Sequence, residues 1–388
     1  MPKIITLFNH KGGVGKTTVA HNLGVSLSKL GKNVLLIDAD TQMNLTSSVL
    51  GLADTVEYAD KNESKWNEYR SKYTKITDYL NNYIQKDILL TKQPIKLYEY
   101  EPDVTQPLIQ EGTGRGKLSL LLGDIGLFKV ESLIYNIVTS KVNQSSSTIY
   151  LIEESIREGI GKDYDYVIID TSPSASSVLN GVFVMMSDYF LCPVFPNFFS
   201  LQAIDNLYEV LKNWVDLLGD FKSTTNFRGL SFQPKFLGII INMAKRFETK
   251  NGDQTDQITA KYTQKWREKL NKSIDSFYTQ LIDTKRTVTK NEFRKIFSFE
   301  DKQSTPFIIE ELCDFTGQIR NISEMSGCPV VDLNNDTVKT TCPRIPIVYF
   351  SIIPEYNSKK KMTHYEKVFK DAVDSYNYIA NSIVKNLK

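Results

Sequence analysis

One glycine-rich stretch near the N-terminus constrains the fold of this chain more than any other feature. Residues 8–24 read FNHKGGVGKTTVAHNLG, an apolar segment over residues 3–9 precedes the glycines, and apolar side chains at helical spacing follow them. Gly31 ends that helical pattern, and a second apolar segment begins at residue 34. A strand, a glycine-rich turn, a helix and a second strand predict one β-α-β unit of an α/β fold.

The same alternation of apolar segments and helical patterns continues along the chain. Short, continuously apolar strands that alternate with helices predict a mostly parallel, twisted sheet with helices on both faces. Ligands of such sheets bind at the carboxyl ends of the strands. The later apolar segments cover residues 34–37, 166–169, 189–192, 236–241 and 345–350, the last of them ahead of a final helix.

Two stretches interrupt this alternation, and both are expected to be insertions. Residues 53–115 are rich in tyrosine, asparagine and lysine, which indicates a small helical excursion. Residues 245–340 combine an amphipathic basic stretch with a segment rich in serine, asparagine and aspartate. We therefore predict a single domain over residues 1–388, with insertions at about 53–115 and 245–340.

Composition excludes several classes of protein. The chain has 388 residues, of which 41% are hydrophobic and 24% charged, and no apolar run approaches the ~20 residues of a membrane helix. Its N-terminus does not have the pattern of a signal peptide. The four cysteines form no CxxC pair and the three histidines do not cluster near them, so we expect neither a zinc site nor disulfides, and a cytoplasmic location. Because the net charge is only +2, any binding of nucleic acid must use a local basic patch.

The glycine-rich stretch also predicts a phosphate site. Gly15-Lys16-Thr17 matches the end of the P-loop pattern GxxxxGK[ST], although His10 stands where the first glycine is usual. Glycines let successive backbone N–H groups point inward, the lysine reaches the β and γ oxygens, and the hydroxyl of Thr17 binds Mg²⁺. We therefore predict that the chain binds a nucleoside triphosphate with Mg²⁺. The residues expected to contact it are Gly12, Gly13, Val14, Gly15, Lys16, Thr17 and Thr18.

Acidic residues follow two of the predicted strands. The segment LLIDAD places Asp38 and Asp40 at the end of one strand, and DYVIIDTSPS places Asp170 at the end of another. Asp170 has the position of a carboxylate that holds Mg²⁺ directly or through water. An aspartate after a parallel strand can instead simply cap the next helix.

These motifs together resemble those of the ParA/MinD superfamily. The string KGGVGKTT (11–18) resembles its deviant Walker A motif, VLLIDADTQMNLT (34–46) its DxDPQxN segment, and DYVIIDTSPS (165–174) its Walker B segment. CPVFPNFFSLQAIDNL (192–207) resembles the strand, loop and helix that come later. The chain departs from the family at Thr41 and Ser172, where proline is usual or common. The resemblance covers residues 1–52, roughly 116–245 and 345–388, so both insertions lie outside it.

The resemblance implies an ATPase that dimerises when ATP is bound. In this family the early lysine, here Lys11, contacts the ATP phosphates of the other subunit, which gives the stretch a reason to carry two lysines. Lys11, Lys16 and Asp40 would then serve catalysis, with Asp40 orienting the attacking water. Thr17, Asp38 and Asp170 would surround the metal. Asn242 falls where family members contact adenine, although an asparagine at a strand end is often only a turn residue.

A surface for the dimer to act on is suggested by two basic stretches. In ParA-like proteins the ATP-bound dimer binds DNA without sequence preference, through basic residues spread over the C-terminal half. Neutralising phosphates with lysines needs no contact with the bases. A lysine-rich helix face can also be only a solvated surface. The residues expected to contact DNA are Lys265, Arg267, Lys269 and Lys360.

The function predicted from the sequence is that of a nucleoid-associated ATPase that positions a cargo, such as a plasmid or chromosome. Its partners would be a second copy of the chain, non-specific DNA and a ParB-like or adaptor protein that stimulates hydrolysis. The alternatives are a protein cargo such as carboxysomes, as in McdA-type relatives, a MinD-like regulator on a membrane surface, and a metabolic P-loop enzyme. A membrane regulator would insert its C-terminal helix, but we expect that helix to pack on the sheet. Its apolar stripe comprises Phe369, Val373, Tyr376, Ile379, Ile383 and Leu387.

Overall fold

The computed structural model describes residues 1–52, 59–84, 95–99, 114–139, 151–224, 233–244, 246–251, 254–259, 261–297, 307–313, 323, 328–333 and 364–387. A sheet in the order β10-β7-β6-β1-β5-β2-β4-β3 forms its centre, and every pairing is parallel except that of β3 with β4. The strands are β1 (Lys3–Leu7), β2 (Val34–Ala39), β3 (Tyr98–Glu99), β4 (Leu118–Leu121), β5 (Tyr166–Thr171), β6 (Tyr189–Val194), β7 (Lys235–Ala244) and β10 (Ile308–Cys313).

The central strands are apolar on both faces because helices cover both sides of the sheet. Every residue of β2 and β5 is buried, and Leu36 and Ile168 are 0% exposed. The predicted fold class is confirmed, and the segments at 3–9, 34–37, 166–169, 189–192 and 236–241 correspond to β1, β2, β5, β6 and β7. The segment predicted at 345–350 lies outside the described residues.

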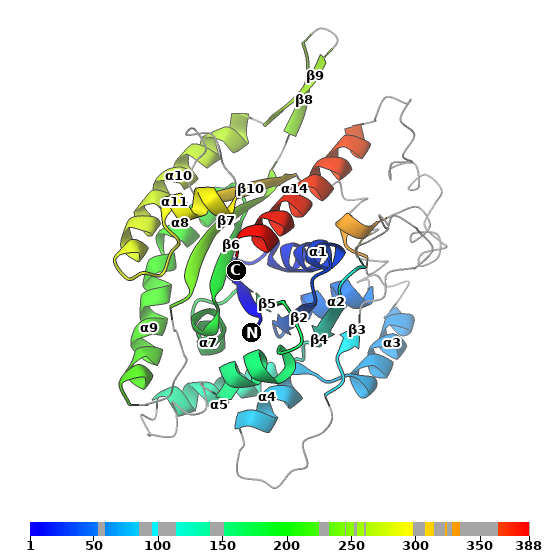
Figure 1. The fold of residues 1–388 in the computed structure, drawn as a ribbon, viewed down its shortest axis with the longest axis vertical. Helices are drawn as coiled ribbons and strands as arrows, with labels where there is room; N and C mark the ends of the chain where they lie inside the picture. Colours follow the sequence, from blue (N-terminus) through cyan, green and yellow to red (C-terminus); the bar gives the residue numbers. More distant parts are fainter. Residues whose placement is uncertain are drawn as a thin grey trace.

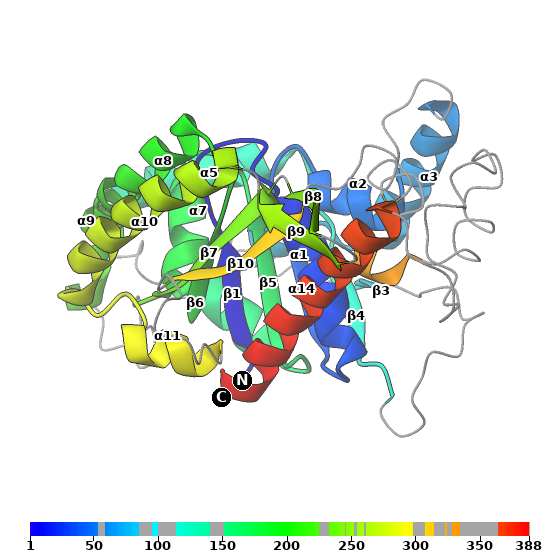
Figure 2. The ribbon, with the colours of Figure 1, turned by 90° about the horizontal axis from the view of Figure 1, so that it is seen from above.

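Helices lie on both faces of this sheet (Figure 1). The helices α1 and α14 cover one face, and α5, α7 and α9 cover the other. In the view of Figure 2, α10 runs beside α8 and α9. The helices are α1 (Lys16–Lys29), α2 (Asn44–Leu50), α3 (Ala59–Lys72), α4 (Ile76–Ile84), α5 (Leu127–Thr139), α7 (Val178–Met186), α8 (Phe198–Asp205), α9 (Leu207–Thr224), α10 (Lys261–Ile282), α11 (Lys290–Ile296) and α14 (His364–Asn386), with a π-helical turn η2 (Ser155–Ile160) and a 3-10 turn η3 (Val330–Asp332).

The stretch at 245–340 differs from the expected insertion. Its strand β10 pairs with β7 and extends the main sheet, and its helices α10 and α11 bury apolar residues against α8, α9 and α14. Among the described residues of this stretch, the hairpin of β8 (Arg246–Asn251) and β9 (Gln254–Thr259) projects away from the body (Figure 1). The stretch at 53–115 contains the expected helices, α3 and α4, and adds β3 to the edge of the sheet.

The last helix packs on the body of the protein, as its apolar stripe predicts. Tyr376, Ile379 and Ile383 of α14 are fully buried, and the helix packs against α1, α11 and β10. The apolar stripe of this amphipathic helix therefore faces the core. It also ties the C-terminal helix to α1, which begins at the glycine-rich loop.

Candidate functional site

The loop between β1 and α1 is shaped by glycines whose conformations other residues rarely adopt. Gly13 and Gly15 have φ angles of 70° and 85°. A Cβ atom on Gly15 would lie 1.7 Å from the side-chain nitrogen of Asn242, so any side chain there would displace Asn242 as well as strain the backbone. The side chain of Asn9 accepts the N–H of Lys11 at 2.9 Å and donates to the carbonyl of Pro193 at 2.8 Å. The loop is therefore fixed from both sides.

Lys16 begins α1 and points back into this loop. Lys16 is only 7% exposed, and its Nζ donates to the carbonyl of Asn9 at 3.1 Å. Burial lowers the pKa of Lys16, while the nearby carboxylates of Asp170 and Asp40 oppose that shift. A buried ammonium beside the N-terminus of a helix gives two sources of positive potential in one place, which suits a polyphosphate.

A hydroxyl and a carboxylate meet next to Lys16. Thr17 donates from Oγ1 to Oδ2 of Asp170 at 2.6 Å, and Asp170 lies fully buried at the end of β5. The other oxygen, Oδ1, accepts no hydrogen bond. Burial raises the pKa of Asp170 to about 7, and the neighbouring Asp38 adds to the shift. A cation held by Thr17 and Asp170 would satisfy this oxygen and offset the burial of the carboxylate.

The ligands available here fit Mg²⁺. Magnesium keeps several waters and takes one or two protein oxygens together with phosphate oxygens. Within the part of the chain that the structure describes, no group of three or more histidine, cysteine or acidic side chains could hold a metal ion by itself. Thr17 and Asp170 supply two oxygens of the kind that Mg²⁺ takes alongside phosphate oxygens.

The two aspartates after β2 have different surroundings. Asp38 is fully buried and its carboxylate accepts the N–H groups of Thr46 at 2.7 Å and Asp40 at 3.2 Å. Burial raises the pKa of Asp38 to about 6, against the effect of these hydrogen bonds. Asp40 lines the cavity described below, and its Oδ1 accepts the N–H of Gln42 at 3.0 Å. Asp38 therefore organises the turn, and Asp40 presents a carboxylate to the cavity.

Asn242 lies at the carboxyl end of β7, directly against the glycine-rich loop. Its side-chain nitrogen donates to the carbonyl of Val14 at 3.1 Å, and its oxygen accepts the N–H of Met243 at 3.0 Å. Met243 has a φ of 57°, so this strand ends in a tight turn. Asn242 reaches the cavity, and its amide already holds the loop in place.

A cavity of about 510 Å³ is lined by the loop and by the N-terminal part of α1. It brings together most of the residues predicted to bind the nucleotide, which come from the ends of β1, β2 and β7. Gly12, Gly13, Val14, Gly15, Lys16, Thr17, Thr18, Asp40 and Asn242 all line it, as do His21, Asn22, Gln42, Asn44, Ser47, Ser48, Leu52, Pro173, Met243, Ser323 and Val330.

Lys11 points away from this cavity. Its Nζ donates to Oδ1 of Asn197 at 2.7 Å and to Oγ of Ser200 at 3.3 Å, at the N-terminus of α8. The ring centroids of Phe195 and Phe199 lie 5.8 and 5.9 Å from the ammonium, a cation–π distance. Burial lowers the pKa of Lys11. The sequence did not single out Asn197 or Ser200, although PNFFS has the pattern of a helix N-cap.

The residues predicted to contact DNA have mixed surroundings. Lys265 is exposed, whereas Arg267 forms an ion pair with Glu311 at 3.1 Å. Lys269 is also exposed, and its ammonium lies 4.9 Å from the ring centroid of Trp266. Lys360 lies outside the described residues. Lys265 and Lys269 therefore keep their charges at the surface of α10, and the charge of Arg267 is partly balanced.

Comparison with known proteins gives a consistent picture. A family model described as "AAA domain" matches residues 2–220. An uncharacterized protein of Methanocaldococcus jannaschii is 30% identical over 209 residues, which are 54% of this chain and 65% of that protein. The chromosome partitioning protein ParA of Caulobacter vibrioides is 28% identical over 212 residues, which are 54% of this chain and 62% of that protein. The chain thus spans less than two thirds of the length of these relatives.

A solved structure shares the fold. The structure of pNOB8 ParA aligns with 100% of this chain and 99% of its own, with a TM-score of 0.52 and 17% sequence identity. Among the helices that the structure describes, none is long and apolar enough to cross a membrane.

Proposed function

Since this chain belongs to the ParA/MinD superfamily of P-loop ATPases, we propose that it binds ATP with Mg²⁺, dimerises in that state and positions a cargo along DNA. In this proposal residues 1–388 act as one ATPase domain, associated with the nucleoid in the cytoplasm. The observation that carries it is the buried ammonium of Lys16 beside the 2.6 Å contact between Thr17 and Asp170, since Lys16 and Thr17 both line the cavity.

The residues around the phosphates would act by their positive charge and by their fixed positions. Lys16 and the N–H groups of the glycine-rich loop would neutralise the β and γ oxygens, which need fixed positive potential as hydrolysis proceeds. Thr17 and Asp170 would hold Mg²⁺, which when bound stabilises the charge that develops on the phosphate oxygens. Because Lys16 is already held by Asn9, little reorganisation is needed when the phosphates arrive.

Asp40 would orient the attacking water. Its carboxylate faces the cavity and is fixed by the N–H of Gln42. Asp38 stands behind it and fixes the turn through the N–H of Asp40 and of Thr46. A carboxylate within reach of water near the γ-phosphate can accept its proton or align it for attack. Asp38 would tune the metal side of the site by its charge.

Lys11 would act on the phosphates of a second copy of the chain. Its present partners, Asn197 and Ser200, are neutral, so a phosphate offers it a stronger, charge-assisted hydrogen bond. Exchange of neutral partners for a phosphate across the interface would make dimerisation depend on ATP, and hydrolysis would weaken the same contact.

DNA would be bound through the phosphate backbone by the exposed lysines of α10. Lys265 and Lys269 lie one helical turn apart and keep their charges in solvent. Contacts of this kind carry no base preference and weaken steeply with salt. A partner protein that stimulates hydrolysis would link the dimer to its cargo, a plasmid or chromosome.

Binding of random duplex DNA tests the proposal. The purified protein is measured with ATP, with ADP and without nucleotide over a salt series. We expect binding with ATP alone, and a steep loss of affinity as the salt concentration rises. Binding that ignores the nucleotide, or no binding while ATP is still hydrolysed, would contradict the proposal.

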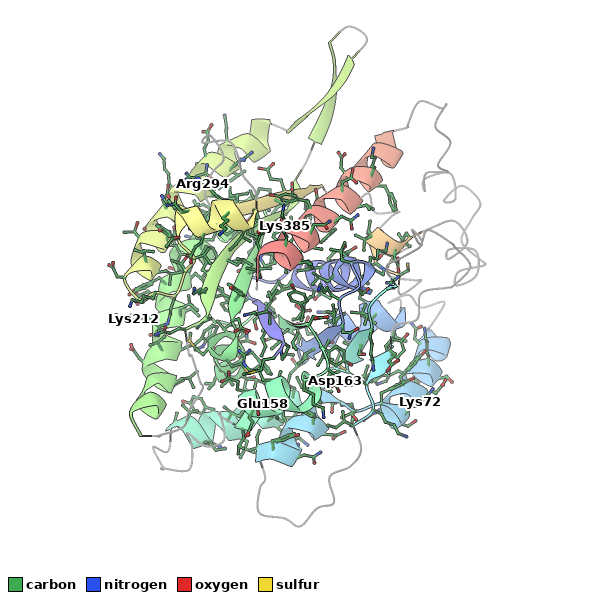
Figure 3. The ribbon with its side chains drawn as sticks, viewed as in Figure 1. Lys72, Glu158, Asp163, Lys212, Arg294 and Lys385 are labelled. Atoms are coloured by element: carbon green, nitrogen blue, oxygen red, sulfur yellow. The ribbon has the colours of Figure 1, made fainter. Side chains whose placement is uncertain are left out.

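Charge reversal locates the DNA-binding face. The double variant Lys265→Glu, Lys269→Glu should weaken ATP-dependent DNA binding more than about tenfold at ~150 mM salt. The control is Lys72→Glu on α3, which lies on the far side of the molecule from Arg294 on α11 (Figure 3). Equal loss in both variants would show that overall charge, and not this face, determines binding.

A further inference from the structure

The helix α5 carries apolar side chains on two faces. On its outer face Phe128 and Tyr135 are each 52% exposed. These two residues are seven positions apart, so they lie on the same side of the helix, about 10 Å apart along its axis. Large apolar side chains that share an exposed face are typical of a surface that binds another molecule. The face that α5 buries in the core comprises Leu127, Val130, Ile134 and Val138.

A groove of about 470 Å³ is lined by this exposed face. The helix α5 supplies Phe128, Glu131 and Tyr135 to it, and the loop that leads into α7 supplies Ser176. Glu131 is the only charged residue among the described ones that line the groove. The ammonium of Lys129 lies 5.8 Å from the ring centroid of Phe128, and Lys129 does not line the groove. The groove therefore has two aromatic rings with one negative charge between them along the helix.

These features define the chemistry of the molecule that would fit. Two apolar side chains about 10 Å apart match the two rings, and an α-helix provides this spacing between positions seven apart. A lysine or arginine between them would meet Glu131, with which no described residue forms an ion pair. Apolar anchors at helical spacing are the pattern by which a groove binds an amphipathic helix.

The loop at the edge of the groove also reaches the candidate nucleotide site. Between Asp170 and α7 this loop includes Pro173, which lines the cavity of about 510 Å³, and then Ser176, which lines the groove. A Cβ atom on Gly12 would lie only 3.9 Å from the side chain of Pro173. A molecule in the groove would therefore contact a loop that also borders the glycine-rich loop.

Asn180 fastens this loop to α7. Its side-chain nitrogen donates to the carbonyls of Ser172 at 3.0 Å and Ser174 at 2.9 Å. Its backbone N–H donates to Oγ of Ser177 at 3.1 Å, and the whole residue is buried. The loop and the first turn of α7 are thus held as one unit. A displacement of the loop at the groove would therefore also displace the part that borders the cavity.

We propose that the groove between α5 and the loop before α7 binds an amphipathic helix of a partner protein. Its apolar side chains contact Phe128 and Tyr135, and a basic side chain pairs with Glu131. This docking surface goes beyond the proposed function and does not require a nucleotide. The bound helix and the nucleotide act on the same loop, so each changes the affinity for the other by the same factor. This coupling rests on the nucleotide binding proposed above.

A charge swap with a synthetic helix tests the docking surface. The probe is a fluorescent peptide of about 18 residues, built on alanine and glutamine, with two leucines seven positions apart and an arginine between them. A second peptide has glutamate in place of this arginine. Fluorescence anisotropy measures the affinity of the full chain for both. The arginine peptide should bind about fivefold more tightly than the glutamate peptide.

Two variants and a matched control locate the binding. In Glu131→Lys the preference between the two peptides should reverse. In Tyr135→Ser the arginine peptide should bind about fivefold more weakly, because an apolar contact is lost. Glu68→Lys is the control for added charge, since Glu68 is exposed on α3 and does not line the groove. This control should keep the preference of the unaltered chain.

Saturation with Mg²⁺ and a non-hydrolysable ATP analogue should change the affinity for the arginine peptide about threefold or more. An analogue that binds and leaves this affinity unchanged overturns the coupling. The docking surface is overturned if Glu131→Lys keeps the original preference, or if Glu68→Lys loses it as well. It is also overturned if light scattering without nucleotide shows a dimer that Tyr135→Ser abolishes, since a second copy would then occupy the groove. If the peptides bind as expected and the analogue does not bind, the proposed function fails and the docking surface stands.

Discussion

Lys11 and Lys16 stand five positions apart in one loop and have opposite surroundings. Lys16 is buried at the start of α1, next to Asp170 and Asp40, and points into the loop. Lys11 leaves the loop and rests on α8 among neutral groups, Asn197 and Ser200. The same ammonium group can therefore be a fixed part of a phosphate site or a charge held ready for another ligand. The backbone direction and the partners decide which.

The largest effect should come from Lys16, because it is the fixed cation of the site. Lys16→Ala is expected to weaken ATP binding more than about hundredfold, since a buried charge-assisted contact is lost. Titration with a fluorescent ATP analogue measures this. Lys162→Ala, an exposed lysine at the other end of the sheet, is the control and should bind normally. Near-normal ATP binding by Lys16→Ala would show that Lys16 is not the fixed cation of the phosphate site.

Asp40 lines the same cavity as Lys16. We expect it to affect the rate of ATP hydrolysis and not the affinity for ATP. Asp40→Ala is expected to bind ATP and to lower turnover about hundredfold, the usual contribution of a group that handles a proton. Phosphate release measures turnover, with the exposed Asp163→Ala as control. Normal turnover in Asp40→Ala would show that another group orients the water.

The burial that surrounds Lys16 continues along α1 to His21. Burial lowers the pKa of His21 from 6.5 to about 3, although Asp332 opposes the shift. The unfolded chain therefore binds a proton below pH 6.5 that the folded chain excludes, and stability falls as the pH falls. The free energy of unfolding should lose about 2 kcal/mol from this residue between pH 7 and about pH 5. In His21→Asn, urea unfolding should show a flatter dependence on pH; an unchanged slope would contradict this.

A substitution next to Lys11 should have a smaller effect, and it tests whether Lys11 leaves its neutral partners. Asn197 caps α8 by accepting the N–H of Ser200 at 3.0 Å, and aspartate caps helices equally well. Asn197→Asp thus keeps the helix and gives Lys11 a charged partner. We expect the ATP-dependent dimer to dissociate about tenfold more readily, because a partly buried ion pair competes with the phosphate. Sedimentation measures this, and Asn206→Asp at the other end of α8 is the control for added charge. Equal dissociation in both variants would show that Lys11 is not released from Asn197.

The sequence predicted the parts of this molecule that depend on local pattern. Continuous apolar segments predicted β1, β2, β5, β6 and β7, because a strand that helices cover on both faces has apolar side chains on both faces. The glycines and Lys16 marked the loop. By contrast, β10 reads IIEELC and carries Glu310 and Glu311, so its pattern does not indicate a buried strand.

Long-range contacts could not be predicted in the same way. Lys11 meets Asn197 across 186 positions and Lys29 meets Val331 across 302 positions, and no local signal links either pair. For Asn242 the sequence predicted a contact with the base, and the fold adds that its amide holds the loop through Val14. Such roles depend on which strand ends the sheet brings together.

The mass of the protein in solution tests the central claim most directly. Light scattering on the 44.3 kDa chain, with Mg²⁺ and a non-hydrolysable ATP analogue, should give twice the monomer mass, and the monomer mass with ADP. Lys11→Ala should bind the analogue and remain a monomer. A Lys11→Ala protein that dimerises as the unaltered chain does would show that Lys11 does not act across an interface.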